Sequence, residues 1–312
     1  MKYITNQEAK LLQSVVTLGK FDGVHVGHRK LIEYAMAQKE KGLQSVVFSF
    51  LFQGNNLLIK DGTDMIYTEK EKYRVLGEMG VDVFWSYPFD KNCMQMEAEE
   101  FVEKVLVGKV GAKEIVVGND FHFGRQRKGD VALLKKLADQ FGYTVTSLDK
   151  VNYEGEPVSS TRIRGLIKNG DMETVNQLLG KPYHITETVV HGRQIGRTLG
   201  IPTINMVPQT GKLLPPNGVY ASTTMIDGKA YAGITNIGVK PTVGSDSVIA
   251  ETHIFDLNRD LYDQELTVSL YKFQRKEQKF GSVEELKQTM EQDCRASREY
   301  FSKELFSRET FS

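Results

Sequence analysis

The stretch Leu18-Gly19-Lys20-Phe21-Asp22-Gly23-Val24-His25-Val26-Gly27-His28 decides the fold of the first half of the chain. It follows an apolar run, 15–18, that predicts a buried strand, and it precedes residues 29–40, whose apolar positions have helical spacing. Its glycines allow a sharp turn and a close approach of the backbone to a ligand. The N-terminus of the following helix favours a phosphate, which His25 and His28 can both face. The sequence therefore predicts a phosphate site at a strand-to-helix turn.

Two simpler interpretations of this turn stay open. A glycine-rich turn of this kind can be only a tight connection. A His-x-x-His pair can also ligate a metal, but no cysteine or further histidine lies nearby to complete such a site. The length of the motif favours the phosphate site. The positions predicted to bind this phosphate, besides the two histidines, are Gly19, Phe21, Asp22, Gly23 and Gly27.

The composition indicates an ordinary globular protein with room for two domains. The chain has 312 residues, of which 40% are hydrophobic and 26% charged. Lysine plus arginine equals aspartate plus glutamate, so no net charge favours nucleic acid or an anionic membrane. We expect neither a signal peptide nor a membrane span. Cys93 and Cys294 form no Cys-x-x-Cys pair, which favours free thiols in the cytoplasm.

Strand-like and helical segments alternate through the first half of the chain. Expected strands are 45–50, 81–85, 114–118 and 143–148, and expected helices are 68–79, 98–107 and 130–141. Strict alternation predicts a parallel sheet with helices on both faces. Ligands bind such sheets beyond the carboxyl ends of the strands, which is where the 18–28 motif lies.

A second polar motif, Gly-Asn-Asp-Phe-His-Phe-Gly at 118–124, directly follows an expected strand. It can be a plain polar turn, because asparagine and aspartate favour turns. The functional interpretation is that Asn119 and Asp120 contact a nucleotide or a flavin. The basic residues at 125, 127 and 128 suit phosphates, although most short basic clusters are solvated surface.

A third motif, Val-Ser-Ser-Thr-Arg-Ile-Arg at 158–164, leads into a helical pattern. Serine and threonine before a helix are good N-caps, and this account can hold together with a functional one. Hydroxyl donors, a helix N-terminus and guanidinium groups also suit triphosphate oxygens. We therefore predict that Ser160, Thr161 and Arg164 bind the triphosphate.

Helical periodicity stops near residue 183, where we place the domain boundary. Strand-like segments follow at 221–226, 229–237, 248–256 and 265–273, with Asp227-Gly228 as a tight hairpin turn. Closely spaced antiparallel strands with glycine and proline turns predict a small barrel. A helix that begins with the capping box Ser282 and Glu285 ends the chain.

The chemistry of the second half centres on residues 192–205. Gly192, Gly196 and Gly200 can form a loop over a nucleotide, although a barrel loop with structural glycines is the simpler alternative. A hydroxyl and a carboxamide oxygen are hard ligands, so Thr203 and Asn205 suit Mg²⁺ with its phosphates and waters. Glu251 lies in a strand-like segment, where a carboxylate is usually solvated. It becomes a candidate base if it points at the metal and the acceptor hydroxyl.

The first and third motifs resemble the two hallmarks of the nucleotidyltransferase superfamily, G-x-F-D-G-x-H-x-G-H and S-S-T-x-I-R. From 14 to 306 the chain resembles the bacterial bifunctional riboflavin kinase/FAD synthetase family. This resemblance implies an α/β, Rossmann-like FMN adenylyltransferase domain at 1–183. It implies a riboflavin kinase domain at 184–312, built as a six-stranded antiparallel β-barrel with a terminal α-helix. The implied pathway is riboflavin to FMN to FAD, with ATP as the second substrate of both steps.

The resemblance also implies roles for single residues. His25 and His28 would hold the ATP phosphates, and Asn119 would help define the adenylylation site. Ser160, Thr161 and Arg164 would contact the triphosphate. Thr203 and Asn205 would bind Mg²⁺–ATP, and Glu251 would accept the proton of the riboflavin 5′-hydroxyl. The implied partners are these small molecules, with no nucleic acid and no membrane, and self-association is left open.

One departure from the family pattern concerns the loop after the second strand. The family usually carries Phe-x-Pro-His-Pro there, whereas this chain reads Phe-Ser-Phe-Leu-Phe-Gln-Gly-Asn-Asn at 48–56. Lys20 is also a bulky charged residue within the turn. We therefore predict an active kinase, and adenylyl transfer with altered affinity or metal preference. The alternatives are an enzyme with one silent module and a non-catalytic flavin-binding protein.

Overall fold

The computed structural model describes residues 1–51, 64–192, 196, 200–242 and 245–309, with the backbone alone at 240–242, 245–247 and 304–309. Contacts divide the chain into two compact units, Met1–Ser160 and Thr161–Ser312. The residues between 161 and 183 thus fold with the second unit. The domain boundary that we place at 183 stays a prediction.

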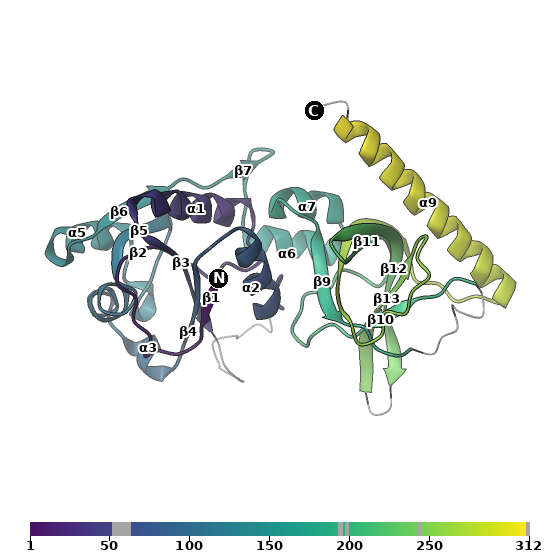
Figure 1. Cartoon of the computed structure of the whole chain (residues 1–312), viewed down its shortest axis with the longest axis horizontal. Helices are drawn as coiled ribbons and strands as arrows, with labels where there is room; N and C mark the ends of the chain where they lie inside the picture. The colour runs from purple at the N-terminus through teal and green to yellow at the C-terminus, as the bar shows by residue number, and fades with distance from the viewer. Residues whose placement is uncertain (52–63, 193–195, 197–199, 243–244, 310–312) are drawn as a thin grey trace. The chain divides into compact units, whose positions relative to one another are not determined.

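The first unit is built on the expected parallel sheet (Figure 1). Its strands, in spatial order, are β1 (Lys2–Ile4), β4 (Val83–Pro88), β3 (Gln44–Leu51), β2 (Ser14–Leu18), β5 (Ala112–Gly118) and β6 (Thr144–Leu148). All neighbouring pairs run parallel. The edge strand β1 was not predicted, because its three residues are too few to show a period.

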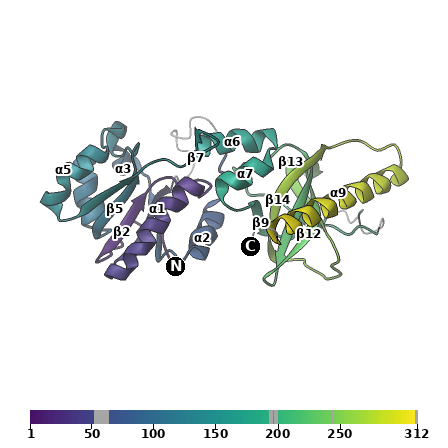
Figure 2. The same cartoon turned by 90° about the horizontal axis from the view of Figure 1, so that it is seen from above.

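Helices cover both faces of this sheet. They are α1 (Val26–Ala37), α2 (Glu69–Glu78), α3 (Lys91–Gln95), α4 (Ala98–Phe101) and α5 (Val131–Phe141). Alternate residues of the central strands face opposite sides: Val16 packs with Phe101 and Leu134, whereas Val15 packs with Ala35 of α1. Figure 2 shows α1 on one face and α3 and α5 on the other.

The helix expected at 98–107 is confirmed in extent, but its second half is not α-helical. After α4 the chain continues as a π-helical segment, η2 (Val102–Val107), in which Gly108 N–H donates to the carbonyl of Glu103 at 2.9 Å. The wider turn still buries Val102, Val105 and Leu106 against the sheet. Apolar spacing predicts this face, but it cannot separate a bond to the fourth residue back from one to the fifth.

The strand order places two of the sequence motifs at one point of the sheet. The chain runs outward from β2 to β3 and β4, and then returns to add β5 and β6 on the other side of β2. The order therefore reverses between β2 and β5, whose carboxyl ends flank a crevice. The 18–28 motif leaves the end of β2, and the 118–124 motif leaves the end of β5.

The second unit is the expected antiparallel barrel, preceded by α6 (Ser160–Asn169) and α7 (Met172–Leu179). Its strands, in spatial order, are β10 (Ile204–Met206), β13 (Ser245–Ile254), β12 (Lys229–Thr242), β11 (Gly218–Ile226), β14 (Glu265–Lys276) and β9 (Tyr183–Thr188). Just beyond β9, Val190 N–H donates to the carbonyl of Asn205 in β10 at 2.8 Å. This bridge joins the two outer strands and closes the barrel.

A long helix, α9 (Val283–Glu309), lies along the barrel (Figure 1). Arg275 of β14 makes two hydrogen bonds, of 2.9 and 2.7 Å, to the carboxylate of Asp293 in this helix. The capping box is half confirmed: Glu285 N–H donates to the hydroxyl of Ser282 at 3.1 Å, but the Glu285 carboxylate accepts from Gly281. No helix in the described parts of the chain is long and apolar enough to cross a bilayer.

Candidate functional sites

The turn after β2 has a strained backbone held by specific hydrogen bonds. Phe21 and Val24 are fully buried non-glycine residues with φ of 48° and 42°, a left-handed region that such residues rarely adopt. The Asp22 carboxylate accepts from Tyr67 N–H at 3.2 Å, and the Asp22 carbonyl accepts from the Ser160 hydroxyl at 2.9 Å. Strain of this kind persists where the surroundings over-determine a conformation, as at ligand sites. Phe21 and Asp22 thus hold the conformation of the turn, and neither lines the cavity described below.

His25 and His28 are stacked on each other at the start of α1. Their ring centroids lie 3.6 Å apart, and His28 also packs on Phe21 at 5.1 Å. His25 Nδ1 accepts the hydrogen bond of His28 N–H at 3.3 Å. A methyl group at Gly27 would lie 3.2 Å from the His25 ring, and one at Gly19 would lie 3.3 Å from Phe21. The two glycines therefore leave room for the aromatic rings of the motif.

Both imidazoles are held neutral. Burial lowers the pKa of His25 to about 4. Burial, together with the nearby His25 and Lys72, lowers the pKa of His28 well below 6.5. Because Nδ1 of neutral His25 is an acceptor, its proton sits on Nε2, which can donate to a ligand. Among the described residues Nδ1 of His28 is buried without a hydrogen-bond partner.

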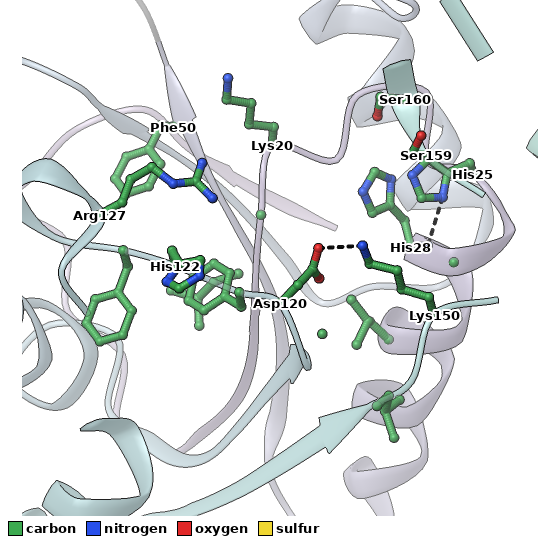
Figure 3. Close-up of a pocket in the computed structure, with 18 of the residues that line it drawn as sticks. Lys20, His25, His28, Phe50, Asp120, His122, Arg127, Lys150, Ser159 and Ser160 are labelled. Carbon is green, nitrogen blue, oxygen red and sulfur yellow. Dashed lines mark hydrogen bonds and ion pairs between the residues drawn. The ribbon is translucent and has the colours of Figure 1, made fainter. Parts of the chain in front are cut away.

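A cavity of about 490 Å³ opens at this point within the first unit. Six of the predicted site residues line it: Gly19, His25, Gly27, His28, Asp120 and Ser160. Figure 3 shows His25 and His28 with Ser159 and Ser160 at one end, and Arg127 with Phe50 and His122 at the other. The cavity thus has a polar end at the helix N-terminus.

The opposite end of the cavity is aromatic, which the sequence did not predict. Phe50 packs against Phe89 with 5.1 Å between ring centroids, and Phe121 is stacked on Phe123 at 5.7 Å. All four rings line the cavity together with Phe101. These five rings come from four separate segments of the chain, so no local sequence pattern could reveal the cluster. The segment 52–56 of the altered family loop lies outside the described residues.

The structure separates the two residues predicted to bind flavin. The side-chain amide of Asn119 donates to Asp149 at the end of the neighbouring strand, and Asn119 is exposed. Asp120 lines the cavity and pairs with Lys150 at 2.8 Å, which lowers the pKa of its carboxyl. Thr161 and Arg164 follow in α6, in the second unit. Their contact with a triphosphate stays a prediction.

The barrel brings together the three residues predicted for phosphoryl transfer. Thr203 donates its hydroxyl hydrogen bond to Glu251 Oε1 at 2.7 Å. Asn205 lies directly opposite Glu251 in the β10–β13 pair, so both side chains share one face of the barrel wall. Asn236 lies opposite Glu251 on its other side, and its amide donates to Glu277 at 3.1 Å. No motif in the sequence predicts a role for Asn236 or Glu277.

Two glycines fit closely around this group. A methyl group at Gly192 would overlap the carboxamide of Asn205, and one at Gly196 would overlap the carbonyl oxygen of Ile201. Gly200 has a φ of 77° and open space around it. Residues 193–195 and 197–199 of the predicted nucleotide loop lie outside the described residues.

The donor set of the barrel site fits Mg²⁺. Thr203, Asn205 and Glu251 offer a hydroxyl, a carboxamide and a carboxylate, all hard oxygen ligands. No cluster of three or more His, Cys, Asp or Glu that could hold a metal occurs among the described residues. An ion with few protein ligands, completed by phosphates and waters, is how Mg²⁺ binds at phosphoryl-transfer sites.

A parallel sheet with a phosphate-type helix N-terminus, joined to a barrel with a Thr-Asn-Glu set, defines a two-module nucleotide-dependent transferase. Comparisons with known proteins agree. The family model for FAD synthetase matches residues 7–162, and the one for riboflavin kinase matches residues 179–301. The chain belongs to the bifunctional riboflavin kinase/FMN adenylyltransferase family, and both modules are present.

Relatives cover nearly the whole chain. The Escherichia coli K12 bifunctional riboflavin kinase/FMN adenylyltransferase is 37% identical over 92% of each chain. The Bacillus subtilis enzyme of the same name is 33% identical over 96% of this chain and 95% of its own. A solved Streptococcus pneumoniae structure, titled a macrolide-efflux protein, is 31% identical with a TM-score of 0.83, covering 96% of this chain and 99% of its own. The family membership confirms the resemblance seen in the sequence.

Proposed function

We propose that the first unit transfers AMP from ATP to FMN in the cavity at the β2–α1 turn, and that the barrel phosphorylates riboflavin at Glu251. The observation that carries the proposal is that the predicted residues gather into two separate sets. One set lines the cavity of the first unit, and the other shares one face of the barrel wall. Free thiols at Cys93 and Cys294 are in keeping with a cytoplasmic location.

In the adenylylation site, neutral His25 donates from Nε2 to an ATP phosphate oxygen, and the N-terminus of α1 adds its free N–H groups. His28 supports the His25 ring by stacking on it and also lines the cavity. Ser160, which lines the same cavity, binds a further oxygen of the triphosphate. The aromatic end takes the flavin ring, and Asp120 and Asn119 border it. The FMN phosphate is already anionic and needs no base.

In the kinase site, Glu251 accepts the proton of the riboflavin 5′-hydroxyl as that oxygen attacks the γ-phosphate of ATP. Its hydrogen bond from Thr203 fixes the orientation of the carboxylate that accepts this proton. Thr203 and Asn205 would hold Mg²⁺, which supplies charge neutralisation on the phosphates when bound. Positioning and electrostatics supply most of the rate in such transfers.

Product analysis by chromatography tests both halves. Purified protein receives ATP, Mg²⁺ and riboflavin in one tube, and ATP, Mg²⁺ and FMN in another. We expect FMN and FAD in the first tube and FAD in the second. FMN without FAD in either tube would mean a silent first module. FAD only in the second tube would mean that the Thr203, Asn205 and Glu251 set is not a working kinase site.

The variant Glu251→Gln sharpens this test, because the amide keeps the size of the side chain and removes the base. We expect riboflavin phosphorylation to fall about 100-fold or more, in the range of a lost general base. FAD formation from supplied FMN should be unchanged. An unchanged kinase rate would exclude Glu251 as the base.

A further inference from the structure

Two cationic side chains of the cavity have no part in the roles above. Lys20 follows Gly19 in the β2–α1 turn, and Arg127 belongs to the loop after β5. Both line the cavity, although they lie far apart in the sequence. Figure 3 shows the two side chains at the part of the cavity near Phe50, away from Ser159 and Ser160.

The backbone at each cation is fixed. The carbonyl of Lys20 accepts from the Ser49 hydroxyl at 3.1 Å, and Gly19 N–H donates to Phe48 at 3.1 Å. The loop that carries Arg127 is closed by a pair of hydrogen bonds, of 3.0 and 2.9 Å, between Phe123 and Gly129. These hydrogen bonds therefore fix the backbone from which the Lys20 and Arg127 side chains extend.

Arg127 also sits on strained backbone. Gln126 and Arg127 have φ of 54° and 60°, two successive non-glycine residues in the left-handed region. Gly124 and Gly129 press on Ala98 so closely that a methyl group at either would overlap it. Strain that is held in place by such packing is typical of positions with a functional side chain.

The structure distinguishes Arg127 from the neighbouring basic residues. Arg125 pairs with Glu97 at 3.0 Å, and Lys150 pairs with Asp120 at 2.8 Å. Lys128 is exposed, as Arg127 is, but Lys128 does not line the cavity. Among the described residues Arg127 makes no ion pair. Of the basic residues in this loop, Arg127 thus lies at the aromatic end of the cavity and has no carboxylate partner among the described residues.

Two positive side chains that line one cavity favour an anionic ligand there. The neighbouring lining is aromatic, with Phe50, Phe89 and Phe121 on separate segments. A ligand that satisfies both features is a planar aromatic compound that carries a phosphate. The proposed site for the triphosphate of ATP is at the polar end of the cavity, at His25 and Ser160.

We propose that Lys20 and Arg127 bind the 5′-phosphate of the FMN acceptor and hold it for attack, an inference that rests on the proposed adenylyl transfer. A non-bridging oxygen of that phosphate forms a bond to the α-phosphorus of ATP. The bond from that phosphorus to the oxygen bridging to the β-phosphorus breaks, and pyrophosphate leaves with the electron pair. Lys20 and Arg127 offset the repulsion between the two anions, and Lys20 stands in the turn that leads to His25.

Steady-state kinetics on the full chain test this assignment, with Lys20→Ala and Arg127→Gln as variants. Loss of a charge-assisted hydrogen bond should raise the KM for FMN about tenfold or more in each variant. The KM for ATP should change less than about threefold, and Lys20→Arg should restore most of the affinity for FMN. In the reverse reaction, the KM for pyrophosphate should stay unchanged.

Lys128→Gln is the matched control, because it removes one positive charge from the same loop outside the cavity. Riboflavin phosphorylation by the barrel reports on the integrity of each variant. An unchanged KM for FMN, or a rise in the KM for ATP and pyrophosphate instead, would overturn the assignment. Wild-type protein that forms no FAD from FMN would overturn the proposed adenylyl transfer, and this inference with it.

Discussion

At the scale of single residues, the spacing of the first motif predicts that His25 and His28 face the same side of the helix start, but it does not predict their state of charge. Three-residue spacing at a helix start brings the rings together, as observed. Their neutrality follows from burial, which depends on Phe21, Val24 and the rest of the folded turn. A phosphate site made of neutral imidazoles and N–H groups binds by hydrogen bonds and by the helix dipole.

The low pKa of His25 predicts that the first unit loses stability in mild acid. The unfolded chain takes up this proton below about pH 6.5 and the folded unit only near pH 4. Stability should therefore fall as pH drops from about 6.5 towards 4, and be unaffected by this group above 6.5. His25→Gln should reduce the loss between pH 7 and pH 5 by about 1–2 kcal/mol.

Trp85 makes this measurement specific. It is the only tryptophan in the chain, and it is fully buried in β4 of the first unit. Urea unfolding followed by its fluorescence at pH 7 and pH 5 gives the two free energies of unfolding. Equal pH dependence in wild type and variant would show that His25 titrates alike in the folded and unfolded states.

At the scale of elements, the sequence predicts features that depend on neighbouring residues in the chain, and it misses features that depend on contacts between distant segments. The Asp227-Gly228 turn is confirmed with φ of 48° and 78°, because that dipeptide suits a two-residue hairpin. The three-residue β1 is missed because its pairing depends on β4, and the π-helical form of η2 is missed because apolar spacing does not report which carbonyl each N–H bonds. The aromatic end of the cavity is missed because its rings come from β3, from α4 and from the loops after β4 and β5, which only the folded sheet brings together.

The fit of Gly192 around Asn205 predicts a selective loss of kinase activity. In Gly192→Ala the new methyl group would overlap the Asn205 carboxamide, which must move. A displacement of about 1 Å at a transfer site can cost about 100-fold in rate, so we expect a loss of that order. FAD synthesis from FMN should be retained. Gly228→Asn, in a barrel turn with open space and left-handed backbone, is the control and should keep full kinase activity.

Two ion pairs connect α9 to the barrel, and we expect their loss to lower the free energy of unfolding by different amounts. Asp293 is buried and makes two hydrogen bonds to Arg275, whereas Asp256, which pairs with Arg298, is exposed. Asp293→Ala should destabilise the second unit by about 3 kcal/mol, because a half-buried guanidinium loses its partner. Asp256→Asn should cost much less. Circular dichroism of unfolding measures both, and the Trp85 transition should not move in either variant.

At the scale of the whole molecule, the sequence predicts two modules because its hydrophobic period changes from helical to alternating. It does not settle their boundary. α6 and α7 have helical patterns like those of the first half, yet they fold with the barrel. Asn176 of α7 donates to the carbonyl of Leu270 at 2.9 Å and accepts from Tyr183 N–H at 2.8 Å. The period of the hydrophobic residues predicts whether a segment is a helix or a strand, but it does not predict which sheet the segment packs against.

Two sites in one chain predict that each can work without the other. The cavity is lined by residues of the first unit, and the Thr203, Asn205 and Glu251 set belongs to the second. A mixture of Glu251→Gln and His25→Ala proteins should therefore convert riboflavin to FAD, although neither variant does so alone. FMN leaves one protein and enters another, so it should accumulate first and FAD should follow after a lag that lengthens on dilution. Each variant should still perform its own single step. If both single steps proceed but the mixture makes no FAD, FMN must pass between the two sites of one chain.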